Sequence, residues 1–318
     1  MASNRKKDRA IQACAIISIV LCVIAAAFGF LFSTFDIGFQ TERSSSVYIS
    51  SASQISSLGK SLYNDRIYLT GDITVDDANL RIGTDEFPFE GVFDGQGYTI
   101  HLTYKSVSDG TSLFGYISPA AVVRNVNFVF DDIVVEGSTF GGIAKINDGV
   151  IENCTLTYNT MEISGGGMFS PLVTINRGRL SHVVVSGKLV GKMSEENERD
   201  VFFGNVCVYN LGSLKSAIAH ADFAELNCTD ELNILKGLSK NIGISALRYS
   251  DSEGGTTVSA FAILPDGQIT TDKKTSKIEF SSVENIYTAD HIFNVMDFNN
   301  KYWSLDNFNL SLTVGGKK

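Results

Sequence analysis

The chain has few of the residues that build metal and redox sites. It contains five cysteines and four histidines, with no Cys-x-x-Cys pair and no cluster of cysteine with histidine. Zinc sites and dithiol redox sites need such spacings, so the sequence contains a motif for neither. The acidic pair Asp76–Asp77 has no EF-hand spacing around it and is interpreted as an exposed turn. We therefore expect no metal and no cofactor.

Long segments with helical periodicity are missing after Tyr63. Helices that wrap a sheet would need such segments, so the pattern argues against an α/β fold. The chain also lacks a Gly-x-Ser-x-Gly elbow, so a serine-hydrolase triad has no support. What remains is a chain rich in short β-prone runs.

One long apolar segment lies near the N-terminus, in residues 10–32. At about 1.5 Å per residue it is long enough to span a hydrocarbon core of about 30 Å. Four basic residues and one acid precede it in residues 1–9, and such basic flanks stay in the cytoplasm. We expect a single-pass signal anchor at the cell membrane, with a cytoplasmic N-terminus and an extracytoplasmic C-terminal domain. A cleaved signal peptide, cut near Ala25-Ala26-Ala27, is the alternative.

The chain as a whole is acidic, with a formal net charge of −9 although its first nine residues are basic. An acidic exterior binds nucleic acid poorly, so we expect no nucleic-acid partner. Residues 33–50 are rich in serine and threonine and predict a short stalk. Residues 51–312 are predicted to form the extracytoplasmic domain with its end caps, and residues 313–318 a frayed tail.

Four stretches of this domain repeat one pattern of apolar residues, a polar turn ending in glycine, and a second β-prone run. The glycines of the turns are Gly149, Gly178, Gly212 and Gly267. A unit with a period of about 28 residues is too short to bury its own core, and it predicts a stack of coils built from short strands. The predicted fold is an all-β, right-handed parallel β-helix with a short capping helix.

The repeats also predict which side chains stack from coil to coil. Positions six and three before the glycines are predicted to point inward: Ile143, Leu172, Val206 and Phe261, then Ile146, Ile175, Tyr209 and Leu264. Two positions before the glycines stand Asn147, Asn176 and Asn210, which could hydrogen-bond from one coil to the next. Cys154 and Cys207 align with small apolar residues of other repeats, so both are interpreted as core residues.

The aromatic residues allow a structural and a functional interpretation. Phenylalanines begin the repeats at Phe114, Phe140, Phe169 and Phe203. A buried aromatic ladder is favoured over an exposed platform for sugar stacking. The candidates for surface sugar contacts are therefore the tyrosines Tyr104, Tyr116 and Tyr158.

Three segments are assigned to the ends of the stack or to an interruption of it. Residues Ala52 to Tyr63 form a weak amphipathic helix that would cover one open end. The segment from Phe293, which carries Trp303, is interpreted as a closing cap. Residues 230–255 break the rhythm and form an irregular coil, an insertion or a side loop.

The motifs together resemble a known group of proteins. The segments IYLTGDITV, FPFEGVFDGQGYTI and LFGYI, the unit FGGIAKINDGVIENCTL and the final DFNNKYWSLDN resemble bacterial surface proteins with GLUG-type repeats. Those proteins are similar to pectate-lyase-like right-handed parallel β-helices. The resemblance implies an exported protein connected with adhesion or with surface glycans.

The resemblance also suggests an enzymatic alternative. Pectinolytic β-helices cut sugar chains with clustered acidic residues, and the best local match is Asp131–Asp132. Neighbouring strand residues point to opposite faces, and the aligned places hold Asn159–Thr160 and Gly187–Lys188, so no acidic stripe results. We expect a non-enzymatic protein that binds an extended glycan or an envelope or surface protein. A polysaccharide lyase or glycoside hydrolase and a structural envelope spacer are the alternatives.

Overall fold

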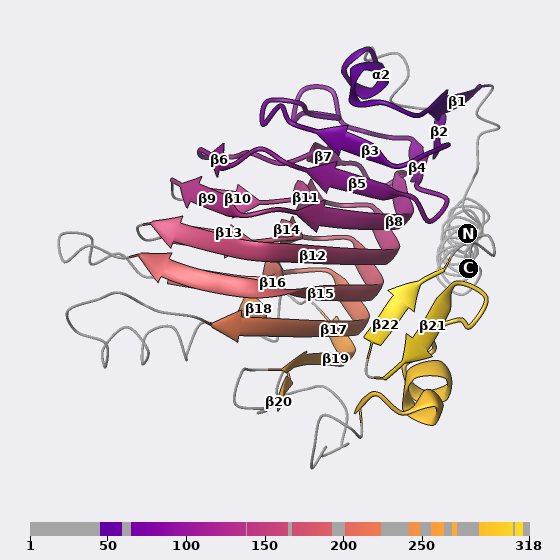
Figure 1. Ribbon diagram of the computed structural model, residues 1–318, viewed down its shortest axis with the longest axis vertical. Helices are drawn as coiled ribbons and strands as arrows, with labels where there is room; N and C mark the ends of the chain where they lie inside the picture. Colours follow the sequence, from indigo (N-terminus) through magenta and orange to yellow (C-terminus); the bar gives the residue numbers. More distant parts are fainter. Residues whose placement is uncertain are drawn as a thin grey trace, which may run out of the picture. The chain divides into compact units, whose positions relative to one another are not determined.

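A computed structural model describes residues 45–58, 65–137, 139–164, 167–192, 201–223, 242–248, 256–263, 269–271, 286–307 and 309–313. All of them lie in the compact unit Ser44–Lys318. They form an all-β parallel β-solenoid, as the repeats predict (Figure 1). The predicted anchor, residues 10–32, lies outside the described residues. Among the residues that are described, no helix has the length and apolarity to cross a membrane.

The larger sheet of the solenoid has 13 strands. Its main path runs through β1 (Ser46–Ile49), β2 (Arg66–Leu69), β4 (Val92–Asp94), β8 (Val122–Phe130), β12 (Val150–Ser164), β15 (Arg179–Lys192), β17 (Ser213–Phe223), β19 (Thr256–Ile263) and β20 (Ile269–Thr271). Beside this path lie β3 (Ile73–Val75), β5 (Thr99–Leu102), β6 (Ser106–Val107) and β9 (Ile133–Glu136). Every pairing is parallel except that of β19 with β20.

The second sheet has seven strands, all paired in parallel. They are β7 (Phe114–Ile117), β10 (Thr139–Gly141), β11 (Ala144–Asn147), β13 (Gly167–Ser170), β14 (Val173–Asn176), β16 (Val201–Asn210) and β18 (Ile242–Arg248). Each strand of this sheet lies between strands of the larger one in the chain, so from β7 to β19 successive coils contribute to both sheets. The remaining described elements are the helices α2 (Ala52–Ser56) and η2 (His291–Val295) and the antiparallel hairpin of β21 (Trp303–Asp306) and β22 (Asn309–Leu312).

The repeat glycines are explained by the close approach of successive coils. A Cβ atom on Gly178 would overlap the carbonyl oxygen of Gly149, and one on Gly212 would overlap the carbonyl oxygen of Gly178. Neither glycine has a positive φ, so the requirement is for space and not for an unusual backbone conformation. The glycine spacing in the sequence therefore marks the places where one turn rests directly on the next.

The predicted asparagine stack is confirmed. Nδ2 of Asn147 donates to Oδ1 of Asn176 at 2.8 Å, and Nδ2 of Asn176 donates to Oδ1 of Asn210 at 2.8 Å. All three side chains are buried. Because identical amides in register supply both donor and acceptor, a polar ladder is tolerated inside the solenoid.

The neighbouring isoleucines correct the predicted orientation. Ile146 pairs with Ile175, as the alignment requires, but both side chains are only partly buried. The asparagines beside them occupy the interior instead. The positions six before the glycines are buried as predicted at Ile143, Leu172 and Val206, whereas the side chains of Phe261 and Leu264 lie outside the described set.

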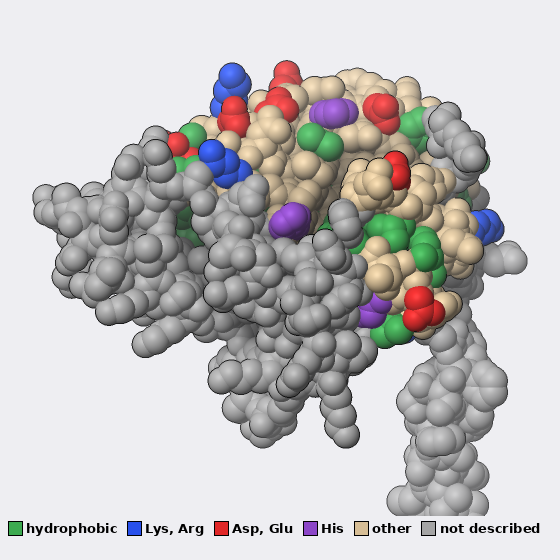
Figure 2. All heavy atoms as spheres, turned by 60° about the horizontal axis from the view of Figure 1, so that its bottom comes forward, with side chains coloured by type: hydrophobic (Ala, Val, Ile, Leu, Met, Phe, Trp, Pro, Cys, Tyr) green, Lys and Arg blue, Asp and Glu red, His purple; other side chains and the backbone are tan. Residues whose placement is uncertain are grey.

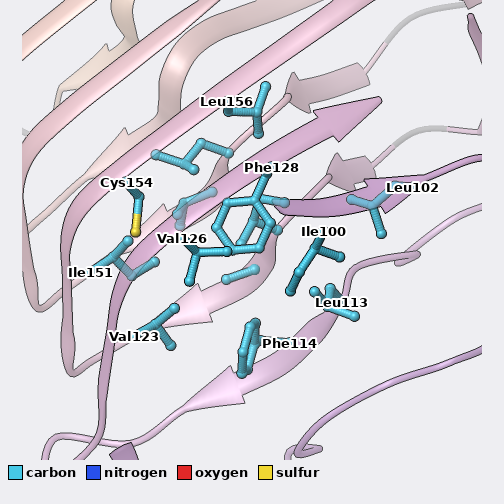
Figure 3. Packing of buried hydrophobic residues seen from close by; sticks show 14 of the residues in the cluster. Ile100, Leu102, Leu113, Phe114, Val123, Val126, Phe128, Ile151, Cys154 and Leu156 are labelled. Carbon is cyan, nitrogen blue, oxygen red and sulfur yellow. The ribbon is translucent and has the colours of Figure 1, made fainter. Parts of the chain in front are cut away.

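The interior is filled by aromatic and aliphatic side chains. Figure 3 shows residues of β5, β8 and β12, together with Leu113 and Phe114, directed toward one another. Phe140 pairs with Phe169, and Phe169 pairs with Phe203, so these three buried rings form the predicted ladder. Phe114 is buried too, but it aligns with Ala144 and its ring packs against Phe89 and Phe93.

Both described cysteines are core residues, as predicted. Cys154 pairs with Val126 and Val183, and Cys207 pairs with Val173. Burial raises the pKa of each thiol to about 12. Both sulfurs therefore remain protonated at neutral pH, which suits small apolar side chains and not nucleophiles.

The long strands of the larger sheet bend at one column of residues with an unusual backbone conformation, which sequence periodicity does not reveal. Four residues at equivalent positions have positive φ values of 51° to 56°: Asn125 in β8, Asn153 in β12, His182 in β15 and Ser216 in β17. Asparagine and histidine tolerate this conformation better than most residues. The column therefore forms a corner at which each coil changes direction.

The two predicted end caps have different outcomes. Helix α2 is present but ends at Ser56. Ile55 and Leu58 are buried in the core as a cap requires, and Leu62 lies outside the described residues.

The C-terminal segment, described over residues 286–307 and 309–313, lies against the side of the stack. We call this segment the C-terminal strap. Trp303 and Phe298 pack in one cluster with Ile218 of β17, and partly buried Val184 of β15 contacts the same cluster.

Candidate functional site

Two of the predicted sugar-contacting tyrosines are buried, which corrects their assignment. Tyr104 is 8% exposed, and its ring packs edge-on against Phe130. Burial raises the pKa of its phenol well above the usual range. Tyr158 is 1% exposed and packs against Gly187, where a Cβ atom would overlap its ring. Neither ring offers a face to an external ligand, because both point into the stack.

The predicted acidic pair is exposed. Asp131 and Asp132 lie in the bend between β8 and β9. Tyr158 pairs with Phe130 and Met161 pairs with Ile133, so the bend of the next coil holds Asn159 and Thr160 beside the two acids. The alignment made from the sequence placed the same residues there. The pair therefore has no carboxylate beside it at the equivalent position of the next coil.

The third tyrosine, Tyr116, takes part in a polar cluster at the surface. Its phenol donates to Oδ2 of Asp148 at 2.5 Å. Arg177 donates to both oxygens of the same carboxylate, from Nε at 2.6 Å and from Nη2 at 2.9 Å. The guanidinium carbon also lies 6.0 Å from the centre of the Tyr116 ring. The cluster thus joins three successive coils, through β7 and the turns that follow β11 and β14.

The electrostatics of this cluster follow from the shared carboxylate. The hydrogen bond to Asp148 is the main reason why the pKa of Tyr116 is raised. The bond to the same carboxylate raises the pKa of Arg177. The Arg177 side chain is 46% exposed, so we regard the pair as a solvated ion pair that fixes geometry and contributes modestly to stability. It holds a tyrosine, a carboxylate and a guanidinium at fixed positions on the outer surface.

Tyr116 also begins a row of outward side chains on the smaller sheet. Parallel pairing places Tyr116 beside Ile146, Ile146 beside Ile175, and Ile175 beside Tyr209. All four side chains are partly exposed. With strands about 4.8 Å apart, the row is roughly 14 Å long. We call these four residues the outer row.

The outer row and the cluster beside it combine two kinds of contact. Tyrosine rings and isoleucine side chains offer apolar surface in a straight line, while Asp148 and Arg177 offer hydrogen-bonding groups along its edge. Lys145, next to Ile146, pairs with Asp85 at 3.1 Å and adds a further exposed polar pair. An elongated ligand with both apolar and hydroxyl-bearing faces would match this arrangement.

The described residues contain no group of three or more histidine, cysteine or acidic side chains that could hold a metal ion. The histidine side chains visible in Figure 2 lie apart from one another, as their scatter in the sequence indicates.

The sequence contained a signal for the outer row that was interpreted with the wrong orientation. The repeat pattern predicts that Ile146, Ile175 and Tyr209 are equivalent, but it places them in the interior, whereas all three are partly exposed. A second signal lies one residue before the glycines, where acidic Asp148 is followed one repeat later by basic Arg177. Opposite charges at equivalent positions of stacked repeats predict a pair between coils, a signal that hydrophobic periodicity does not contain.

Comparison with known proteins supports the fold. No protein-family model matches the chain, and no curated protein matches it. A similar solved structure is that of a "putative immunoglobulin A1 protease" from Bacteroides ovatus. The two chains are 17% identical and superpose with a TM-score of 0.50, over 84% of this chain and 92% of the other. At this identity the likeness concerns the fold alone.

Proposed function

We propose that this protein is a non-enzymatic, membrane-anchored cell-surface protein that binds an extended glycan along the outer row. Residues 10–32 would hold it in the membrane, and the solenoid would lie outside the cell. Its coils would be right-handed, as parallel β-strand crossovers nearly always are. The resemblance to GLUG-repeat surface proteins supports export and display.

The outer row is the observation that carries this proposal. Four partly exposed apolar side chains lie in one register on successive parallel strands, beside a carboxylate and a guanidinium fixed by mutual hydrogen bonds. A stack of parallel strands holds such a line rigidly, so little conformational entropy is lost on binding. Pyranose rings present apolar C–H faces and hydroxyl edges, which suit the row and the cluster respectively.

The activity named for the Bacteroides ovatus protein does not transfer to this chain through the fold alone. A likeness at 17% identity supports a shared fold, and one fold supports many unrelated functions. Envelope proteins remain the alternative class of partner, and they would be distinguished from glycans by the binding test itself.

The first prediction tests the outer row by substitution. The full-length protein, purified in detergent, should bind members of an array of neutral and acidic glycans. Tyr209→Ala should lower the affinity for the best-binding glycan about fivefold, because the loss of one aromatic contact costs of the order of 1 kcal/mol. Tyr209 is the better choice than Tyr116, because the Tyr116 phenol is bonded to Asp148.

Two control variants make the result specific. Tyr48→Ala removes a tyrosine that is 62% exposed on β1 and stacked on Tyr68, outside the outer row, and it should leave the affinity unchanged. The double variant Asp131→Asn, Asp132→Asn should also bind normally. Equal losses in Tyr48→Ala and Tyr209→Ala would contradict the assignment. Shortened glycan products formed by the wild type and lost in the double variant would support the enzymatic alternative.

A further inference from the structure

The C-terminal strap lies across three successive coils at the corner of the larger sheet. Nε1 of Trp303 donates to Oδ1 of Asn153 on β12 at 3.0 Å. Phe298 packs edge-on against His182 on β15, with ring centres 5.3 Å apart. Asp297 pairs with Lys215 on β17 at 3.3 Å. In Figure 1 the hairpin of β21 and β22 accordingly lies beside the ends of these strands.

The strap also covers apolar surface of the solenoid. Ile218 of β17 is fully buried beneath it and belongs to the same cluster as Trp303 and Phe298. Ile218 is in register with Val184 of β15, which packs against this cluster. Release of the strap would therefore uncover an apolar patch on the outer side of the larger sheet.

His182 stands at the centre of this contact. It has a positive φ of 52° at the corner, its ring meets Phe298, and it forms a hydrogen bond with the backbone of Asp297. Its Nε2 atom is buried and has no hydrogen-bond partner among the described residues. Protonation of Nε2 would thus create a buried N–H donor that has no acceptor among the described residues, which is energetically costly.

The charges around His182 come from three elements. Lys215 on β17 and Arg179 on β15 disfavour a positive ring, whereas Asp297 on the strap favours one. Burial is the largest influence and acts in the same direction as the two cations, so the pKa of His182 is lowered. The strap also contains His291, whose Nδ1 lies 2.9 Å from the carbonyl oxygen of Ile286 within the strap itself.

We propose that the C-terminal strap is a pH-sensitive clasp, which is docked while His182 is neutral and is released from the corner when His182 is protonated. Release uncovers the apolar patch around Ile218 and Val184. Neither the anchor nor the outer row is involved, so this inference stands apart from the proposed glycan binding.

The direction of the effect follows from proton linkage. The docked state has the lower pKa, so the released state binds the proton more tightly. Docking is fully favoured above the ordinary histidine pKa of about 6.5 and weakens as the pH falls from there toward the lowered value. Mild acidification should therefore release the strap while the stack, held by its parallel ladders, remains folded.

The second prediction uses Trp303, which is the single tryptophan of the chain and lies in the strap. In the full-length protein, its fluorescence emission should shift reversibly to longer wavelength between about pH 7.5 and about pH 5. The far-UV circular dichroism should stay constant over this range. His182→Asn should abolish the shift, because asparagine does not titrate and already occupies this corner position at Asn125 and Asn153.

Matched histidine variants test whether His182 or another titratable group causes the fluorescence shift. His220→Asn changes an exposed histidine on β17 and should leave the shift intact, and His291→Asn should do the same. If His182→Asn does not show the wild-type emission at pH 7.5, His182→Gln replaces it. An emission that is constant with pH in the wild type would overturn the proposal. So would a shift that survives in both His182 variants, or one that coincides with loss of the β-sheet signal.

Discussion

Gly178→Ala should destabilise the solenoid by about 3 kcal/mol, because its Cβ atom has no space between two coils. The methyl group would overlap the backbone of Gly149 and Asp148, and backbone atoms cannot rotate away as a side chain can. Relief would require separating two turns and lengthening the hydrogen bonds from Arg177 N and Gly178 N to Asn147 O, now 2.8 and 2.9 Å. Urea denaturation followed by circular dichroism measures the loss.

Gly71→Ala is the matched control for this experiment. Gly71 has no atom within 4 Å of an added Cβ and does not have a positive φ. An alanine there should change the free energy of unfolding by less than about 1 kcal/mol, and in the stabilising direction if at all. Equal stability of Gly178→Ala and Gly71→Ala would show that the turns are not stacked as described.

Asn176→Ala should lower the free energy of unfolding by about 3 kcal/mol through loss of hydrogen bonds inside the stack. Asn176 accepts from Asn147 and donates to Asn210, so its removal breaks two buried bonds at once. An unpaired buried amide group costs about 1–3 kcal/mol, which is more than the net gain from forming the bond. The same urea experiment applies.

Asn147→Ala provides the comparison within the ladder. Asn147 pairs with Ile117 on its other side, and its Oδ1 atom is buried without a partner among the described residues. Its replacement breaks only the bond to Asn176 within the ladder, so it should cost about half as much. A larger loss for Asn147→Ala than for Asn176→Ala would contradict a ladder in which the central residue bonds on both sides.

The stacking of the repeats was predictable because it depends on local spacing. Gly149, Gly178 and Gly212 lie at intervals that bring equivalent turns together, and the pairing of Asn147, Asn176 and Asn210 follows from the same register. The predicted inward orientation of Ile146 and Ile175 was wrong, because hydrophobicity alone favours isoleucine over asparagine in the interior. The stacked amides satisfy one another, which removes the cost of burying them and reverses that preference.

The site and the strap depend on contacts that a repeat pattern does not contain. The prediction that Tyr104 and Tyr158 lie at the surface was wrong. The strand alternation that buries them depends on the positions of the bends, which the sequence does not reveal. The bond from Trp303 to Asn153 joins residues 150 positions apart, and no periodicity indicates it. The sequence therefore predicts Trp303 at an end of the stack, whereas it packs against the side of the stack.

The central claim is that the outer row binds an extended glycan without cutting it. The most direct measurement is the affinity of the full-length protein for a size-graded series of the best-binding glycan, with the chain lengths determined before and after incubation. We predict that affinity rises with length until the ligand exceeds roughly 14 Å, the span of the four strands, then levels off, and that chain lengths stay unchanged. Affinity independent of length, or the appearance of shorter chains, would contradict the claim.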